Sequence, residues 1–167
     1  VPLGGVVISR AIADTFRDRP YPGGLTYSGH PLACASAVAS IHIFEDEDVL
    51  GHARMLGTDV IGPELAKIAD KHPSVGEVRG LGVFWAVELV TDRATREPLV
   101  PYNASGAAAA PMTEFAAACK ERGLWPFVHF NRTHVVPPCT TSVEDVHEGL
   151  AILDEALSVA DRYYTGS

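Results

Sequence analysis

The last quarter of the chain has the clearest hydrophobic periodicity. Apolar residues recur there at the spacing of one helix face, at Val143, Val146, Leu150, Leu153, Leu157 and Ala160. Thr141 and Glu144 lie at the start of this run in the T-x-x-E spacing of a capping box. We therefore predict a helix along this segment, with Thr141 as its N-cap.

The middle of the chain alternates between strand and helix patterns. Residues 75–90 are rich in Val, Phe and Trp and predict a strand pair bent at residues 80–82. An Ala-rich segment over residues 112–122 predicts a helix ended by Gly123. Residues 124–136 predict a further strand region, stopped by two prolines.

The first part of the chain has weaker patterns. Val6-Val7-Ile8 follows a Gly-Gly pair and predicts a buried strand, and residues 11–16 a short helix. Pro31 suits the first turn of a helix that we expect to continue to about residue 44, with Ser28 or Gly29 ahead of it as the cap. A second helix is predicted over residues 49–71, broken or kinked at Gly62-Pro63.

Composition excludes several classes of protein. The chain has 167 residues, 47% of them hydrophobic, and 13 basic against 21 acidic side chains give a formal charge of -8. Without a basic cluster we expect no nucleic-acid partner. The apolar stretch from Pro31 is shorter than the roughly 20 residues of a membrane span, so no membrane partner is expected either. The three cysteines lack the spacing of a metal site and predict reduced thiols in the cytoplasm.

Residues 24–36, GLTYSGHPLACAS, raise the question of a binding site. The local pattern alone favours a helix start with Pro31 in its first turn, followed by small residues that allow close packing. A second interpretation is an anion site. In it the hydroxyls of Thr26 and Ser28 and nearby backbone N–H groups bind a phosphate ahead of a helix N-terminus.

Four blocks together resemble a known family. VPLGGVVIS, GLTYSGHPLACASAVASI, VGEVRGLGVFWAVELV and HVVPPCTTSVEDVHEGLAILDEAL resemble, in order and spacing, the C-terminal half of the class III, or omega-type, pyridoxal-phosphate aminotransferases. The resemblance covers nearly the whole chain. It implies an α/β fold of the fold-type-I PLP transferases. Residues 1–50 would be a remnant of the large PLP-binding domain with the interdomain helix, and residues 51–167 the small α+β C-terminal domain.

The resemblance also implies a cofactor and a partner. The cofactor is pyridoxal 5'-phosphate, and the enzyme is a homodimer with its cofactor sites at the subunit interface. In this family the Thr of the T-[FY]-S-G-H-P block contacts the cofactor phosphate of the other subunit. Thr26 is that residue here, with Ser28 beside it, and both are predicted cofactor-binding residues.

The catalytic lysine of the family has no counterpart in the chain. The resemblance implies a Schiff-base Lys about seven residues before the position of Val1. We interpret Lys67, Lys71 and Lys120 as solvated helix charges. We therefore expect a truncated aminotransferase that is inactive by itself. A non-catalytic scaffold and a stand-alone anion-binding domain are the alternatives.

The substrate is indicated by fewer residues. Many family members have an Arg four residues before the second Pro of the PP block, where it binds the substrate carboxylate, and His134 occupies that position here. Arg132 would project to the same face of a strand and could bind the anion instead, although a rim Arg paired with a surface carboxylate is equally compatible. PFVHFNRTHVVPPC resembles the taurine and other ω-amino-acid transaminases. Arg79 is interpreted as structural, and no metal site is predicted.

Overall fold

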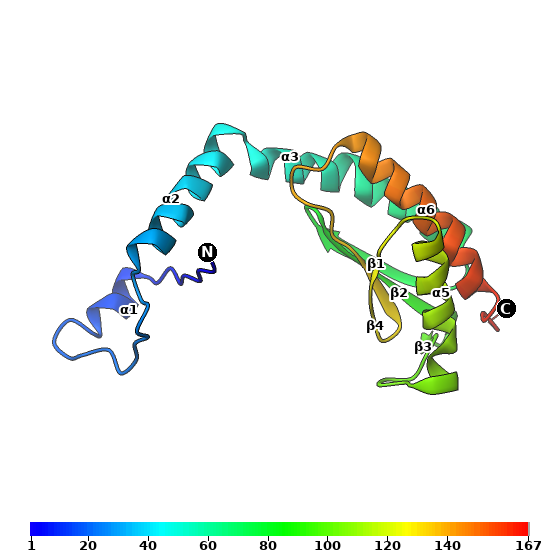
Figure 1. Cartoon of the computed structure of the whole chain (residues 1–167). Coiled ribbons are helices and arrows are strands. Elements are labelled where there is room, and N and C mark those ends of the chain that lie inside the picture. The colour runs from blue at the N-terminus through cyan, green and yellow to red at the C-terminus, as the bar shows by residue number, and fades with distance from the viewer. Residues whose placement is uncertain (167) are drawn as a thin grey trace. The chain divides into compact units, whose positions relative to one another are not determined.

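The computed structural model describes residues 1–166. The chain forms two units, Val1–Asp48 and Val49–Ser167 (Figure 1). Each unit is described by itself. No helix among the described residues is long and apolar enough to cross a membrane. Cys34, Cys119 and Cys139 form no disulfide within the described residues.

The first unit contains two helices, α1 (Arg10–Asp14) and α2 (Pro31–Asp46). α2 begins at Pro31, as predicted. Its N-cap is His30, which makes no side-chain cap, so the expectation that Ser28 or Gly29 caps the helix was wrong. The Ser28 hydroxyl instead accepts a hydrogen bond from the Leu25 amide at 3.2 Å and closes the turn before the helix.

The predicted strand at Val6-Val7-Ile8 is not formed. All three side chains are exposed, and Val7 is fully so. A strand is stabilised by hydrogen bonds to a neighbouring strand, and no strand of the described residues pairs with this segment. The β-branched sequence therefore supplies the propensity for a strand but not its partner.

The second unit opens with a continuous helical run. It consists of α3 (Val49–Met55), the π-helical turn η1 (Leu56–Ile61) and α4 (Gly62–Lys71). Contrary to the expectation, the helical run is not broken at Gly62-Pro63 but passes from the π turn into α4 at that point. Pro63 lies in the first turn of α4, where a missing N–H is tolerated. Gly57 lies so close to the next hairpin that a Cβ there would be 2.2 Å from the Gly82 carbonyl oxygen.

The sheet of the second unit is antiparallel. Its strands are β1 (Val75–Leu81), β2 (Phe84–Asp92), β3 (Glu97–Pro98), β4 (Phe127–His129) and β5 (Arg132–Val135). The order is β1-β2-β5-β4, with β3 on β2. Both predicted strand regions thus form hairpins, β1–β2 and β4–β5, and the two hairpins meet where β2 pairs with β5.

Two further helices complete the second unit. The 3₁₀ turn η2 (Gly106–Ala109) leads into α5 (Ala110–Glu121), and α6 (Val143–Asp161) follows the last strand. The N-cap of α6 is Ser142, whose hydroxyl accepts from the Asp145 amide at 3.1 Å. The predicted cap at Thr141 was wrong by one residue, because Ser and Thr are comparable caps and two adjacent candidates cannot be separated by sequence.

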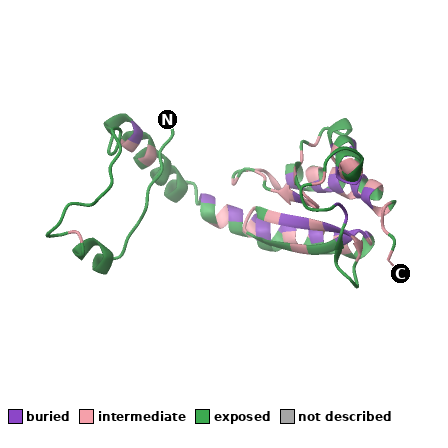
Figure 2. Cartoon of the chain, turned by 90° about the horizontal axis from the view of Figure 1, so that it is seen from below, coloured by how far each residue is buried: buried purple, intermediate pink, exposed green. Residues whose placement is uncertain are grey.

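One face of the sheet packs on these helices to form the core (Figure 2). The largest fully buried side chains come from the helical run, from β2 and from α5 and α6: Leu56, Ile61, Leu65, Leu89, Phe115, Leu153 and Leu157. The side chains of β2 alternate, so that Val87 and Leu89 enter the core while Phe84 and Glu88 point to the opposite face. An antiparallel sheet covered by helices on one face is the α+β arrangement predicted for this part of the chain.

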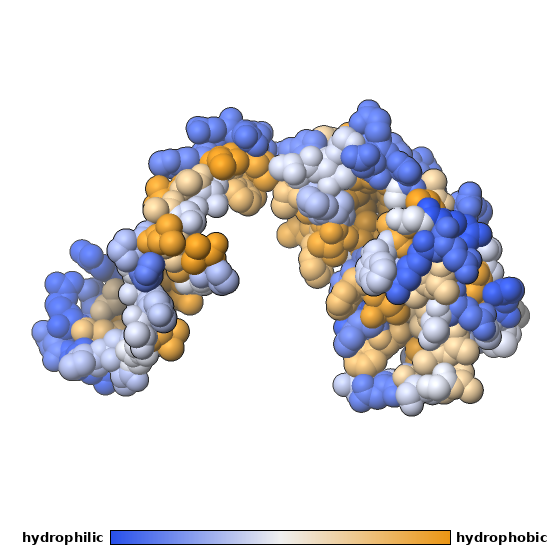
Figure 3. Space-filling model, in the orientation of Figure 1, coloured by the Kyte–Doolittle hydropathy of each residue, from blue (hydrophilic) through white to orange (hydrophobic). Residues whose placement is uncertain are grey.

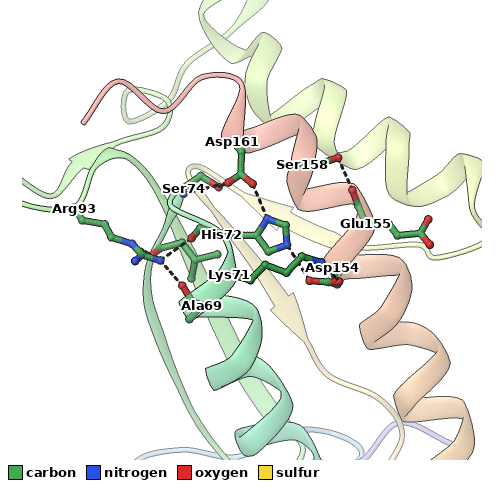
Figure 4. Close-up of polar contacts among 10 residues, drawn as sticks. Ala69, Lys71, His72, Ser74, Arg93, Asp154, Glu155, Ser158 and Asp161 are labelled. Carbon is green, nitrogen blue, oxygen red and sulfur yellow. Dashed lines mark hydrogen bonds and ion pairs between the residues drawn. The ribbon is translucent and has the colours of Figure 1, made fainter. Parts of the chain in front are cut away.

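A polar network joins the end of α4 to α6 (Figure 4). The His72 ring is 4% exposed and lies between two carboxylates, 2.6 Å from Asp161 through Nδ1 and 2.9 Å from Asp154 through Nε2. Ser74 donates to Asp161 through its hydroxyl, and Lys71 donates to Asp154. Burial acts to raise the pKa of the Asp154 carboxyl, but hydrogen bonds from Lys71 and His72 outweigh it and hold that pKa below its usual value.

Candidate functional site

The first candidate region is the turn before α2. Thr26 is exposed, and its hydroxyl has no hydrogen-bond partner among residues 1–166. Ser28 uses one lone pair for the Leu25 amide, which leaves its proton available to an acceptor. Gly29 has φ of 69°, a conformation that glycine adopts without strain. The turn thus presents two hydroxyls immediately ahead of a helix N-terminus, which fits a phosphate contact.

The second candidate region is the face of the sheet away from the helices, here called the open face. It carries Arg79 on β1, Phe84 and Glu88 on β2, Phe127 and His129 on β4, and Arg132 and His134 on β5. Arg132 Nε donates to His134 Nε2 at 3.3 Å, so the two predicted residues do lie on the same face of their strand. These side chains form a continuous group of two imidazoles, two guanidiniums, two aromatic rings and one carboxylate.

Arg79 is held by carboxylates on this face. Its guanidinium is 2.5 Å from Glu88 and 3.3 Å from Glu77. The hydrogen bond that Arg79 donates to Glu88 is the main reason that the pKa of Arg79 is raised. This pairing agrees with the structural interpretation of Arg79.

His134 lies between aromatic rings and positive charges. The rings of Phe84 and Phe127 meet it edge to face, with centroids 5.6 and 5.2 Å away. Burial lowers the pKa of His134, and the charges of Arg132, His129 and Arg79 lower it further. The imidazole is therefore biased toward its neutral form.

His129 is a member of this group that the sequence patterns did not single out. Its Nδ1 is 3.1 Å from Arg132 Nη2, across the β4–β5 hairpin. The sequence held a signal for it, since His129 and Arg132 flank a two-residue turn and so become cross-strand neighbours. Phe130 in that turn has a positive φ of 53° and packs its ring 3.8 Å from that of His129.

A cleft adjoins the open face. It has a volume of about 250 Å³ and extends from Phe127 and His134 to Asp145 and Gly149 of α6. Its lining is mostly apolar. Among residues 1–166, no group of three His, Cys, Asp or Glu side chains is placed to hold a metal ion.

The lysines lie in helices and contact groups of the surface. Lys67 pairs with Glu64 at 2.6 Å, Lys71 pairs with Asp154, and Lys120 lies 4.1 Å from the centre of the Trp125 ring. None of them is part of the turn at Thr26 or of the open face. Their roles in the structure are those of surface ion pairs and a cation–π contact.

Comparison with known proteins identifies the family. The family model described as Aminotransferase class-III matches residues 1–157. The 4-aminobutyrate aminotransferase of Escherichia coli is 32% identical over 164 residues, which are 95% of this chain and 35% of that protein. An uncharacterized aminotransferase of Bacillus subtilis is 38% identical over 74% of this chain and 26% of its own length.

Solved structures agree with this result. The taurine:2-oxoglutarate aminotransferase of Bifidobacterium kashiwanohense, solved with PLP and glutamate, superposes with a TM-score of 0.87 at 36% identity, over 97% of this chain and 35% of that one. An amine transaminase of an uncultivated Pseudomonas species, in its PLP-bound form, has a TM-score of 0.79 at 32% identity, over 89% of this chain and 33% of that one.

The chain belongs to the class III aminotransferase family. This confirms the family resemblance and the fold class predicted from the four sequence blocks. The chain spans about a third of the length of the relatives that it matches along nearly all of its own length.

Proposed function

We propose that this chain forms the C-terminal part of a pyridoxal-phosphate-dependent aminotransferase that transfers an amino group from an amino acid or ω-amino compound to a 2-oxo acid. The observation that carries the proposal is the class III match over residues 1–157. The superposition on an enzyme solved with PLP and glutamate supports it. Pyridoxal phosphate supplies the electron-withdrawing ring that makes amino-group exchange possible when it is bound.

Thr26 and Ser28 are the proposed phosphate contacts of this chain. Both hydroxyls are exposed in the turn before α2, and Thr26 has no competing partner within the described residues. In the proposed homodimer these hydroxyls reach the cofactor phosphate of the other subunit. Cofactor affinity would then depend on dimerisation.

Arg132 is the proposed direct substrate contact, and His134, the other predicted substrate-binding residue, is proposed to support it. A guanidinium matches a planar acid group in two hydrogen bonds. Arg132 lies on the open face and contacts His134, which lines the apolar cleft. The similarity to a taurine:2-oxoglutarate aminotransferase supports an ω-amino acid as amino donor. The donor would therefore carry a carboxylate or sulfonate at the end remote from its amine.

The chain by itself is proposed to be inactive. Its three lysines lie in helices of the second unit, where two form ion pairs and the third contacts an aromatic ring. The test is to add pyridoxal phosphate to this chain and to a protein extended with the residues that its gene encodes upstream. We expect amino transfer to 2-oxoglutarate from the extended protein alone. A stoichiometric, amine-exchangeable cofactor bound to Lys67, Lys71 or Lys120 would contradict this proposal and favour a self-contained module.

The role of Thr26 is tested in the extended dimer. A hydrogen bond to a charged group contributes about 1.5–3 kcal/mol, so Thr26→Ala should weaken cofactor binding by roughly tenfold to a hundredfold. Thr26→Ser keeps the hydroxyl and should have a much milder effect. Unchanged cofactor affinity of Thr26→Ala, with the dimer intact by sedimentation, would leave this turn a packing element.

A further inference from the structure

Two arginines on the open face have different surroundings. Arg79 is compensated by the carboxylates of Glu77 and Glu88. Arg132 forms no ion pair with any carboxylate of residues 1–166, although Glu88 is its direct partner in the β2–β5 register. The Glu88 carboxylate is held by Arg79 instead. The positive charge of Arg132 is thus left without a carboxylate partner.

Two imidazoles take the place of that carboxylate. Arg132 Nε is 3.3 Å from His134 Nε2, and Arg132 Nη2 is 3.1 Å from His129 Nδ1. A guanidinium has five N–H donors and no acceptor, so both ring nitrogens must accept. Each of them is therefore unprotonated, and both histidines are neutral. The two histidines then hold opposite tautomers, with the proton on Nδ1 in His134 and on Nε2 in His129.

Aromatic side chains fix the two rings in these positions. Phe84 and Phe127 meet His134 edge to face. Phe130 packs against His129 and lies 5.7 Å below the Arg132 guanidinium. The rings are consequently oriented by packing, and their accepting nitrogens are directed at Arg132 before any ligand arrives.

The charges around the group favour the neutral form of His134. The strands contribute Arg79 and Glu77 from β1, Glu88 from β2, His129 from β4 and Arg132 from β5. From the helices, Asp145 of α6 lines the same cleft as His134, and Lys120 of α5 lines a pocket with His129. The two carboxylates of the sheet, Glu77 and Glu88, are engaged by Arg79. Burial and the neighbouring positive charges accordingly lower the pKa of His134.

We propose that His129 and His134 are positioning residues that hold Arg132 as an uncompensated cation for the acid group of the amino substrate. This rests on the proposed function, in which Arg132 binds that group. The two imidazoles occupy two of the five N–H donors, and three remain. These can bind a carboxylate or a sulfonate in two parallel hydrogen bonds. Protonation of either histidine would remove an acceptor and place a second cation against Arg132.

The first test is the tautomeric state of the histidines in this chain, read from imidazole ¹⁵N shifts by NMR at neutral pH. We expect an unprotonated Nε2 in His134 and an unprotonated Nδ1 in His129. Arg132→Gln should move both sets of shifts and leave those of His147, an exposed histidine of α6, unchanged. A proton on either accepting nitrogen, or shifts that Arg132→Gln does not alter, would overturn the positioning role.

The second test uses the extended enzyme with three amino donors: β-alanine, taurine and propylamine, which lacks an acid group. His134→Phe should raise KM for a donor that Arg132 binds by roughly tenfold, with kcat at saturation retained and propylamine unaffected. His134→Gln and His129→Asn retain an acceptor that cannot be charged. We expect these two variants to keep the affinity and to lose the rise in KM that the native enzyme shows toward acidic pH.

The outcomes separate the two levels of the proposal. If His134→Phe raises KM more for taurine than for β-alanine, a sulfonate is the preferred acid group. If it raises KM more for β-alanine, a carboxylate is preferred. An equal KM change for propylamine, or the same pH profile in His134→Gln as in the native enzyme, would overturn the positioning role. If Arg132→Gln leaves KM for both acid donors unchanged, the assignment of Arg132 to the substrate fails, whatever tautomers are measured.

Discussion

The two units differ in what stabilises them. Residues 49–166 enclose a core formed by the sheet, the helical run and helices α5 and α6. Among residues 1–48, all of which the structure describes, Ala33 alone is buried. Figure 3 shows apolar side chains on the surface of α2, where Leu32, Val38, Ile41, Ile43 and Phe44 are exposed. The second unit therefore buries most of its hydrophobic side chains in a core, and the first unit leaves most of its own exposed.

This difference agrees with the proposed homodimer. An isolated helix of 16 residues has little stability in water, because most helical stability in proteins comes from packing of an apolar face. In the proposed enzyme, the other subunit and the remainder of the large domain would cover α2. The predictions below test the contrast between the units, from the largest expected effect to the smallest.

Truncation in the core of the second unit should have the largest effect. Phe115 of α5 is fully buried, and Phe115→Ala should lower the free energy of unfolding by about 3–5 kcal/mol through lost transfer energy and the cavity left behind. Urea unfolding followed by circular dichroism measures this. Tyr27→Ala, at an exposed position of the first unit, is the control and should change little. Equal losses in both variants would contradict the contrast.

Removing the imidazole of the α4–α6 network should have the next largest effect. His72→Ala leaves the carboxylates of Asp154 and Asp161 without their shared partner, and we expect a loss of about 1.5–3 kcal/mol, the range for hydrogen bonds to charged groups. The measurement is again urea unfolding at neutral pH. His147→Ala on the exposed surface of α6 is the matched control. A loss no larger than that of the control would show that the network adds nothing to stability.

The same network predicts an acid dependence. The pKa of Asp154 is lowered in the folded chain, so the unfolded chain binds its proton first as the pH falls. Its stabilising contribution is present above the usual carboxyl range near 4 and is lost as the pH falls through the folded value. Asp154→Asn should be less stable at pH 7 and show a shallower further loss toward pH 3. Parallel acid profiles of the two proteins would contradict this origin of the dependence.

Removing the N-cap of α6 should have a smaller effect on stability. It also tests whether Ser142 or Thr141 caps the helix. Ser142→Ala should cost about 1 kcal/mol because the Asp145 amide loses its acceptor. Thr141→Ala should cost less, since the Thr141 carbonyl, which accepts from His52, is retained. Thermal unfolding of both variants measures the difference. A larger loss in Thr141→Ala would restore the capping box predicted from the sequence.

Substitution on the exposed face of α2 should have the smallest effect in this chain. Ile41 is 57% exposed, and Ile41→Ala should change the free energy of unfolding by less than about 0.5 kcal/mol. In the extended protein the same change should weaken the proposed dimer, measured by sedimentation equilibrium. An unaltered dimer would remove Ile41 from the proposed interface.

Local patterns predicted much of the second unit and the start of α2 in the first. The apolar period of α6, the alternation of β1 and β2, and Pro31 at the start of α2 each fix their element through neighbours within a few residues. The four sequence blocks also predicted the family. Even the adjacency of Arg132 and His134 follows from the two-residue period of a strand.

The sequence alone determined the helices, the hairpins and the family, because these depend on short-range periodicity and on motif order. Tertiary structure decided the contacts between residues far apart in the chain. His72 meets carboxylates 82 and 89 positions later, and Val6-Val7-Ile8 forms no strand because none of the described strands pairs with it. Glu88 has two arginines on neighbouring strands and binds Arg79, which leaves Arg132 to two histidines. Which of the two arginines pairs with Glu88 depends on the positions of their side chains across the sheet. Those positions exist only after the β1–β2 and β4–β5 hairpins have paired.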